Sequence, residues 1–217
     1  MTAQSNSTVA INDGMNGYQR RRLETRRVLM DAGKALFVER GVEQVSIDAI
    51  TSKAGVAKGS FYNHFESREA LFEALIEATL AQLLEKRPQI SSDITDPLEQ
   101  GLARTWFSLY TLLSDLSACR LLLQVGQVGA YGAIDKILRV VLGEDLLHGV
   151  AQGSLAHIDR DLVLSAYFGV VTRTIGNLLT REDKIDPEDA ADQLTELCFA
   201  VMGLPHHAPP HFGEAAQ

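Results

Sequence analysis

The chain has 217 residues, of which 46% are hydrophobic and 22% are charged, and its formal net charge is −8. This composition is typical of a soluble globular protein and gives room for one or two compact domains. No apolar run approaches the roughly 18 residues that a membrane span needs, and the polar N-terminus lacks the basic-then-apolar pattern of a signal peptide. We therefore expect a cytoplasmic protein with no membrane partner.

The negative charge is unevenly distributed along the chain. Residues 18–68 hold ten Lys or Arg and six Asp or Glu, which give a formal charge of +4. Residues 69–217 hold ten Lys or Arg and 21 Asp or Glu, which give a formal charge of −11. A basic N-terminal part attached to an acidic remainder favours binding to a polyanion through the N-terminal part. The cysteines, Cys119 and Cys198, form no Cys-x-x-Cys unit, which excludes a zinc site of the usual spacing and predicts buried free thiols.

The first 17 residues are rich in Ser, Thr, Asn and Gly and predict a flexible tail. Three consecutive arginines, Arg20–Arg22, follow. They predict either an arm that grips DNA phosphates or the minor groove, or only the solvated start of a helix. The helix after them has an apolar stripe at three- and four-residue spacing and ends at Gly41. The stripe consists of Leu29, Ala32, Leu36 and Phe37.

Residues 41–71 predict two short helices joined by a turn at Gly55. Ser46 is suited to cap the first helix, in which Ile47, Ile50 and Ala54 share one face. The second helix is expected from about Ala57 to Phe65, with Phe61 and Phe65 facing inward because they are four residues apart. An ordinary helical hairpin would show part of this pattern, but the turn, the short second helix, the lysine and the YxHF ending together favour a helix-turn-helix.

The second short helix also carries polar groups suited to DNA. One cation and several hydrogen-bonding side chains remain for its other faces, which is the chemistry that phosphate and base-edge contacts require. These residues are Lys58, Ser60, Tyr62, Asn63 and His64.

The rest of the chain predicts further helices and no strand, so we expect an all-α fold of about nine helices. Ser67 and Pro187 are placed to begin two of them. The expected ranges after Ser67 are 67–86, 97–116, 118–128, 134–149, 159–180 (or a start at 161) and 187–203, followed by a tail at 205–217.

The stretch from Thr25 to Leu75, TRRVLMDAGKALFVERGVEQVSIDAITSKAGVAKGSFYNHFESREALFEAL, resembles the N-terminal domain of TetR (tetracycline-repressor-type) transcriptional regulators. The resemblance covers about a quarter of the chain. It implies a DNA-binding domain over residues 18–75, with a first helix from about Tyr18 to Arg40, and a ligand-binding and dimerisation domain over residues 76–204.

The resemblance also assigns roles to single residues. It implies DNA contacts from the start of the first short helix, the second short helix and the start of the connecting helix; these residues are Ser46, Lys58, Gly59, Ser60, Tyr62, Asn63, His64 and Arg68. Asn63 occupies a variable position, so it is the candidate for sequence choice. Asp48 departs from relatives that place a cation there, and as an acid it is expected to cap its own helix instead of binding phosphate.

Two late helices predict a dimer interface. Small residues on the first would allow close helix approach, and the second has an apolar face; the residues are Ala166, Gly169, Arg173, Gly176, Leu194, Leu197 and Val201. The resemblance implies a two-fold dimer built as a four-helix bundle from these helices. The alternative is that both faces complete the monomer core.

The middle helices predict an apolar ligand pocket with a few polar groups. Its candidate residues are Trp106, Phe107, Tyr110, Arg120, Gln124, Tyr131, Arg173 and Asn177. The alternative is that the aromatic residues are plain core.

Taken with the resemblance, the sequence predicts a repressor that binds a palindromic double-stranded operator as a homodimer and is released by a small, largely apolar effector. A transcriptional activator and a DNA-independent helical small-molecule-binding protein are the alternatives. No catalytic motif occurs, so we expect no enzyme activity, no cofactor and no metal. The histidines of the run 206–211 are expected to belong to the tail.

Overall fold

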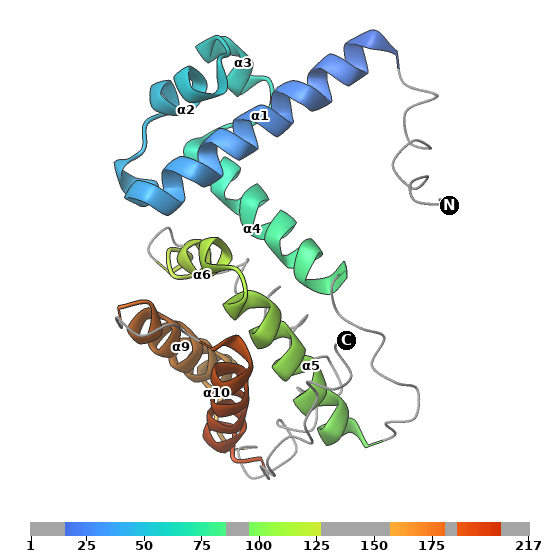
Figure 1. The fold of residues 1–217 in the computed structure, drawn as a ribbon, viewed down its shortest axis with the longest axis vertical. Helices are drawn as coiled ribbons and strands as arrows, with labels where there is room; N and C mark the ends of the chain where they lie inside the picture. The colour runs from blue at the N-terminus through green and yellow to red at the C-terminus, as the bar shows by residue number, and fades with distance from the viewer. Residues whose placement is uncertain (1–15, 86–95, 127–156, 181–185, 205–217) are drawn as a thin grey trace, which may run out of the picture. The chain divides into compact units, whose positions relative to one another are not determined.

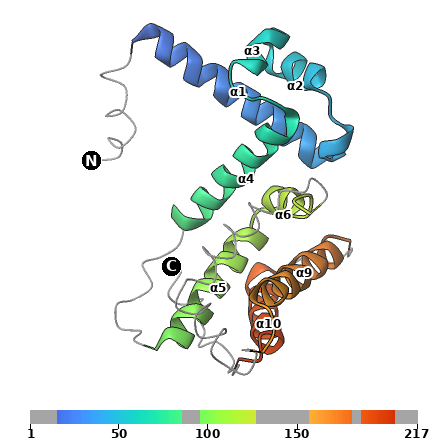
Figure 2. The same ribbon diagram turned by 180° about the vertical axis from the view of Figure 1, so that it is seen from behind.

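The computed structural model describes residues 16–85, 96–126, 157–180 and 186–204. These residues form eight α-helices and one 3-10 helix and contain no strand, which confirms the all-α fold. The chain divides into two compact units, residues 1–72 and 73–217, which we describe separately. Figures 1 and 2 show the helices from opposite sides.

Helix α1, Gly17–Arg40, is the longest helix of the N-terminal unit. Its buried face carries Leu29, Ala32, Leu36 and Phe37, the stripe that the sequence predicts, together with Gly33. A β-carbon at Gly33 would lie 2.7 Å from Cδ2 of Leu71, so the glycine permits a close approach of the two helices here. The helix ends at Gly41, whose φ of 84° lies in the region that favours glycine.

The helix-turn-helix is formed by α2, Ile47–Ala54, and α3, Lys58–Tyr62, preceded by the 3-10 helix η1, Val42–Gln44. The Ser46 side chain caps α2 by accepting a hydrogen bond from the Ala49 amide at 3.1 Å. Gly55 ends α2 in the left-handed conformation, with φ 69° and ψ 30°.

Helix α3 is shorter than the expected range of residues 57–65. It ends at Tyr62, because the Phe61 carbonyl accepts hydrogen bonds from the amides of both His64 and Phe65, at 2.9 and 3.0 Å, in a tight final turn. Asn63 and His64 therefore lie in the turn after α3. Phe61 and Phe65 are 0% and 5% exposed, which confirms that they face inward.

Helix α4, Arg68–Glu85, runs from the N-terminal into the C-terminal unit. Ser67 precedes it, and its hydroxyl accepts a hydrogen bond from the Ala70 amide at 3.1 Å, as expected of a capping residue. Leu71 and Phe72 belong to the N-terminal unit and are 0% exposed. Phe72 meets Phe37 of α1 edge to face, with ring centroids 5.9 Å apart.

The described part of the C-terminal unit contains α5, Pro97–Leu113, α6, Leu116–Leu122, α9, Arg160–Leu179, and α10, Pro187–Val201, besides the end of α4. Helix α10 packs against α5 and α9, and α6 packs against the same two helices. The side chains of Trp106, Leu121, Ile175 and Phe199 are almost fully buried between these helices. The expected helix at 134–149, Tyr131, residues 1–15 and the C-terminal tail lie outside the described residues, whereas Asn16 and Gly17, expected in the N-terminal tail, are the cap and the first residue of α1.

The boundary between α5 and α6 differs from the expectation of a helix to about Leu116 and another from about Ala118. Helix α5 stops at Leu113, and α6 starts at Leu116 because the Asp115 carboxylate accepts hydrogen bonds from the Ser117 and Ala118 amides at 2.9 and 3.2 Å. The sequence did contain a signal for this boundary, because Asp115 is a residue type that caps helices. Helical periodicity alone did not reveal it.

One helix in the described ranges is long and apolar enough to cross a membrane by length and composition alone. It is the stretch Asp161–Leu179 of α9, with a mean hydropathy of 1.4 and 28% of its most apolar window buried. Core helices of soluble proteins meet the same criterion, so this is weak evidence for a span. The low burial also means that much of the apolar surface of α9 is not covered by the rest of the chain described here.

We expect Phe61→Ala to destabilise the N-terminal unit by about 3–5 kcal/mol, because it empties a fully buried site beneath a helix too short to be stable alone. Tyr62→Ala is the matched control: its side chain is 53% exposed, and the expected change is below about 0.5 kcal/mol. Urea unfolding followed by circular dichroism measures both. Equal effects of the two substitutions would contradict the packing described here.

Candidate nucleic-acid interface

Helix α3 is fastened to the unit by one aromatic side chain. Phe61 is 0% exposed and packs at 5.7 Å from Phe65 and 5.6 Å from Tyr62, measured between ring centroids. A five-residue helix has almost no stability of its own, so this burial sets the position of α3. The other side chains of the helix are thereby left toward solvent.

Most of the residues that we expect to contact DNA gather on this exposed side. Lys58, Gly59, Tyr62 and Asn63 are exposed, and Ser60 and His64 are half-buried. They all come from residues 58–64, that is, from α3 and the turn that follows it. Ser46 is exposed as well, at the start of α2.

Lys58 has an ionic partner within the unit. Its ammonium lies 2.9 Å from a carboxylate oxygen of Asp48, and this contact raises the pKa of Lys58 through the hydrogen bond and the opposite charge. Both side chains are more than half exposed, so water screens the pair and it contributes little to stability. Asp48 binds this lysine, while Ser46 caps α2; the carboxylate therefore neutralises a candidate phosphate-binding cation.

Arg68 is engaged inside the unit. Its guanidinium donates to the carbonyl oxygens of Glu43 and Val45 at 3.0 and 3.2 Å, and to the Glu69 carboxylate at 2.6 and 3.0 Å. These bonds tie the start of α4 to the segment between α1 and α2. A role in positioning this segment fits the contacts better than a direct bond to DNA.

Arg26 was not among the expected site residues, yet it supports the end of α3. Its guanidinium lies 4.4 Å from the centroid of the Phe65 ring and donates to the His64 carbonyl at 3.4 Å. The signal in the sequence was its position one turn before Leu29, on the side of α1 that becomes buried. Arg26 therefore links the basic start of α1 to the turn after α3.

His64 lies in a positively charged environment. Partial burial lowers its pKa below the usual 6.5, and the charges of Arg22 and Arg26 lower it further. At neutral pH the imidazole of the free protein is therefore mainly uncharged. It presents a hydrogen-bonding group at the edge of the surface formed by α3.

The expected ligand residues of the C-terminal unit fall into two groups. Trp106 and Phe107 are buried, and Trp106 stacks on half-buried Tyr110 with ring centroids 5.1 Å apart. Gln124 is 9% exposed and its amide donates to the Arg120 carbonyl at 3.0 Å. The side chains of Arg120, Arg173 and Asn177 are exposed, so they do not join this aromatic cluster.

Three buried hydroxyl groups in this unit were not expected. Thr105 on α5, Tyr167 on α9 and Thr195 on α10 each bury a side-chain oxygen, and the Tyr167 hydroxyl interacts with the side chains of Thr105 and Cys198. Burial raises the pKa of Tyr167 well above its usual value, so its hydroxyl stays protonated and able to donate. Tyr167 and Thr105 are far apart in the sequence, which is why helical periodicity alone did not reveal their contact.

The residues expected at a dimer interface are mostly exposed. On α9 these are Ala166, Gly169 and Arg173, and a β-carbon on Gly169 would meet no atom within 4 Å. Half-buried Gly176 faces α6 instead, with Leu123 3.9 Å from its would-be β-carbon. The α10 residues Leu197 and Val201 are 43% and 37% exposed, whereas Leu194 is 2% exposed and belongs to the core of this unit. Leu194 is therefore not available to a partner chain.

No group of three or more His, Cys, Asp or Glu side chains that could hold a metal ion occurs in the part of the chain that the structure describes. Cys119 and Cys198 are free and buried, as expected, and burial raises the pKa of each thiol to about 12. Both thiols therefore stay protonated and unreactive at neutral pH.

Comparison with known proteins shows which protein family the N-terminal unit matches. Residues 29–75 match the family "Bacterial regulatory proteins, tetR family". The HTH-type transcriptional regulator SrpR of Pseudomonas putida is 26% identical over 175 residues, which are 74% of this chain and 78% of SrpR. The HTH-type transcriptional repressor DhaR of Mycobacterium sp. (strain GP1) is 39% identical, but only over 35% of this chain and 36% of DhaR.

A solved structure extends the likeness to both units as a fold. The transcriptional regulator FadR from Bacillus subtilis, in complex with stearoyl-CoA, aligns with a TM-score of 0.59 at 20% identity, over 79% of this chain and 96% of that chain. Both SrpR and DhaR are transcriptional regulators. From the exposed α3, the family match and these relatives, we conclude that the chain carries, over residues 29–75, the N-terminal domain of the TetR family of transcriptional regulators.

Proposed function

We propose that the protein is a ligand-responsive repressor that binds a palindromic operator as a homodimer. The observation that carries the proposal is the surface of α3, where Lys58, Tyr62 and Asn63 are exposed above the fully buried Phe61. A short helix with an exposed cation and hydrogen-bonding side chains fits the major groove of B-DNA. We infer that Lys58, Gly59, Ser60, Tyr62 and His64 position the helix on phosphates, and that Asn63 reads base edges.

The homodimer is supported by the uncovered face of α9. The helix contains a highly apolar window, and yet only 28% of that window is buried within one chain. Leu162 on α9 is 63% exposed, and Leu197 and Val201 extend the apolar surface onto α10. A second copy of the chain would bury these side chains, and two-fold symmetry would present two recognition helices to the half-sites of a palindrome.

The effector site is inferred to lie in the C-terminal unit, at the aromatic group of Trp106, Phe107 and Tyr110. These side chains favour a largely apolar ligand. The buried hydroxyls of Thr105, Tyr167 and Thr195 belong to the same unit and are candidates to bond a polar group on it.

The coupling between the two sites follows from differential binding. An effector that binds better to a dimer unable to span two half-sites shifts the population toward that state and lowers operator affinity. Such couplings are typically about 1–3 kcal/mol, or about 5- to 150-fold. By thermodynamic linkage, operator DNA must then weaken effector binding by the same factor.

Substitutions of the ion pair test the DNA contact. We expect Lys58→Ala to weaken binding to duplexes of every sequence and to lower the slope of log affinity against log salt by about 0.9, because one phosphate contact is lost. Asp48→Asn should strengthen binding, because it releases Lys58 and removes a negative charge. Fluorescence anisotropy with a labelled duplex from upstream of the gene measures both, and Arg40→Ala, at the far end of α1, is the control. An unchanged salt slope in Lys58→Ala would reject the contact.

His64 predicts a pH dependence of DNA binding. In the free protein its pKa is held below 6.5 by burial and by Arg22 and Arg26, whereas a nearby phosphate would raise the pKa. Binding would then take up a proton, so affinity should rise as the pH falls from 8 to 6. We expect His64→Gln to flatten this dependence in the same anisotropy assay. Parallel pH profiles for the two proteins would remove His64 from the interface.

The proposed dimer interface can be tested by placing a charge in it. We expect Leu197→Glu to yield monomers in sedimentation-velocity experiments, because it places a carboxylate in an apolar contact. Leu116→Glu is the matched control, since this leucine is 48% exposed but belongs to α6 instead of α9 or α10. A Leu197→Glu protein that remains dimeric would show that the chains associate through another surface.

A further inference from the structure

The first turns of α1 extend beyond the helix-turn-helix without any buried side chain. The helix starts at Gly17, but its first buried residue is Leu29. Residues 17–28, about 18 Å of helix at about 1.5 Å per residue, are called the overhang here, and within them Arg26 contacts the helix-turn-helix, at Phe65 and His64. Figures 1 and 2 both show these turns continuing past α2 and α3. Helices normally owe their stability to packing, so this overhang needs another reason to exist.

The start of the overhang is fixed by a complete capping box. The Asn16 side chain accepts hydrogen bonds from the amides of Tyr18 and Gln19 at 3.1 and 2.9 Å, and the Gln19 side chain accepts one from the Asn16 amide at 3.1 Å. A capped helix holds its side chains at defined positions. The arginines that follow are therefore displayed on a helix instead of on a loose tail.

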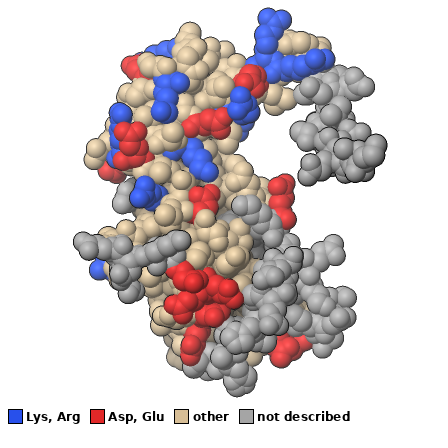
Figure 3. All heavy atoms as spheres, in the orientation of Figure 1, with Lys and Arg blue, Asp and Glu red and all other residues tan. Residues whose placement is uncertain are grey.

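The overhang is strongly basic. Residues 18–27 contain five arginines and one glutamate. Figure 3 shows blue atoms gathered at this end of α1, where Arg20, Arg21 and Arg22 are exposed. Closely spaced like charges destabilise an isolated helix, so this composition favours a partner that carries negative charge.

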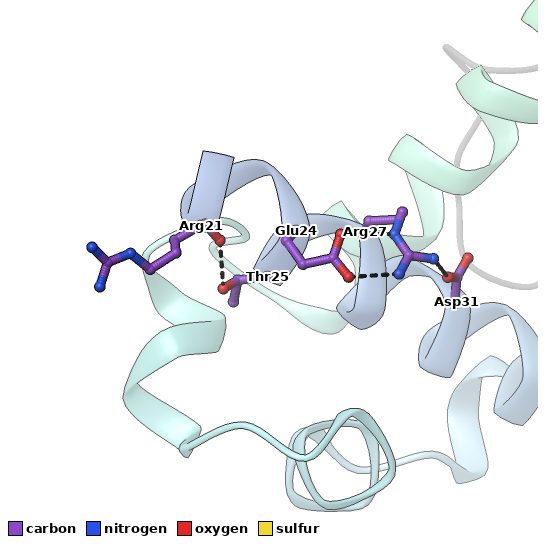
Figure 4. A network of polar contacts seen from close by, with 5 residues as sticks. All are labelled: Arg21, Glu24, Thr25, Arg27 and Asp31. Atoms are coloured by element: carbon purple, nitrogen blue, oxygen red, sulfur yellow. Dashed lines mark hydrogen bonds and ion pairs between the residues drawn. The ribbon is translucent and has the colours of Figure 1, made fainter. Parts of the chain in front are cut away.

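The arginines of the overhang differ in their partners. Arg27 is neutralised by Glu24 at 2.6 Å and by Asp31 at 2.9 Å. Figure 4 shows the Arg21 guanidinium pointing away from this network, and its Nε donates only to the Gly17 carbonyl, at 3.2 Å. In the described ranges, the ion pairs involve neither Arg21 nor Arg22.

The overhang also lies beside the recognition surface. Arg22 is one helical turn before Arg26, which contacts Phe65 and the His64 carbonyl, so both arginines are on the side of α1 that faces the end of α3. The charge of Arg22 is close enough to lower the pKa of His64. The basic surface is therefore continuous from the turn after α3 onto the overhang.

We propose that residues 17–24 of α1 are a second DNA-contacting element, in which Arg21 and Arg22 bind backbone phosphates next to the groove that α3 enters. This inference rests on the proposed function, because α3 must first bring the overhang to the duplex. Guanidinium groups suit the task, since they bind phosphate oxygens through two parallel hydrogen bonds. The contacts add affinity and fix the register of α3, and they carry no base preference.

The test uses the full-length chain and a labelled 20-base-pair duplex of mixed sequence. Anisotropy titrations between 50 and 200 mM salt compare the unsubstituted protein with the double variant Arg21→Ala/Arg22→Ala. Loss of two phosphate contacts lowers the slope of log affinity against log salt by about 1.8. The gain in affinity between 200 and 50 mM salt is therefore about 12-fold smaller for the variant than for the unsubstituted protein. Lys34→Ala/Arg40→Ala removes the same charge from the other half of α1 and is expected to keep the original slope. Circular dichroism melting checks that both variants are folded.

The outcomes separate this inference from the proposed function. A reduced slope in Lys58→Ala, with an unchanged slope in Arg21→Ala/Arg22→Ala, would leave the DNA-binding function intact and overturn the second element. Equal losses in the two double variants would overturn it too, because they would reflect net charge alone. If Arg21→Ala/Arg22→Ala bound DNA normally but lost binding to vesicles of anionic phospholipid, the overhang would belong to a membrane surface and the inference would fall. Arg21→Lys/Arg22→Lys is expected to restore most of the slope.

Discussion

The burial of Phe61 is the interaction on which the DNA-binding surface depends. Helix α3 has five residues and cannot stand alone, so the contact of this ring with Phe65 decides which side of the helix faces solvent. Arg26 extends the support by covering the Phe65 ring and bonding the His64 carbonyl. An apolar anchor thus positions polar groups that contribute little to stability and are available to a partner.

Electrostatics divides the chain between two tasks. The N-terminal unit displays exposed arginines and Lys58, whereas α10 carries Glu188, Asp189, Asp192 and Glu196, and Figure 3 shows acidic atoms gathered there. A duplex would be attracted to the first unit and repelled by the second. Asp48 moderates the attraction by pairing with Lys58 in the free protein. Under the proposed function, a bond from Lys58 to DNA would replace this ion pair, which favours discrimination over raw affinity.

The helices and the way α3 packs could largely be predicted from the sequence, because their signals are local. Ser46, Gly55 and the i,i+4 pair Phe61 and Phe65 each act within one or two turns, and the structure places them as expected. The end of α3 could not be predicted, since it depends on the Phe61 carbonyl accepting two amides. The partners of Arg68 lie 23 and 25 residues away, so its engagement within the unit was hidden as well.

By itself, the sequence determined the all-α class, the helix-turn-helix and the basic N-terminal part, because helix periodicity, capping and net charge are properties of neighbouring residues. Only the tertiary structure decided which residues are free to act. It buried Leu194 and left Leu197 exposed, joined Asp48 to Lys58, and brought Tyr167 of α9 into contact with Thr105 of α5. It also showed α1 starting well before its first buried residue. The physical reason is that burial and ionic pairing depend on distances through space, which residues far apart in the chain reach only when the helices pack.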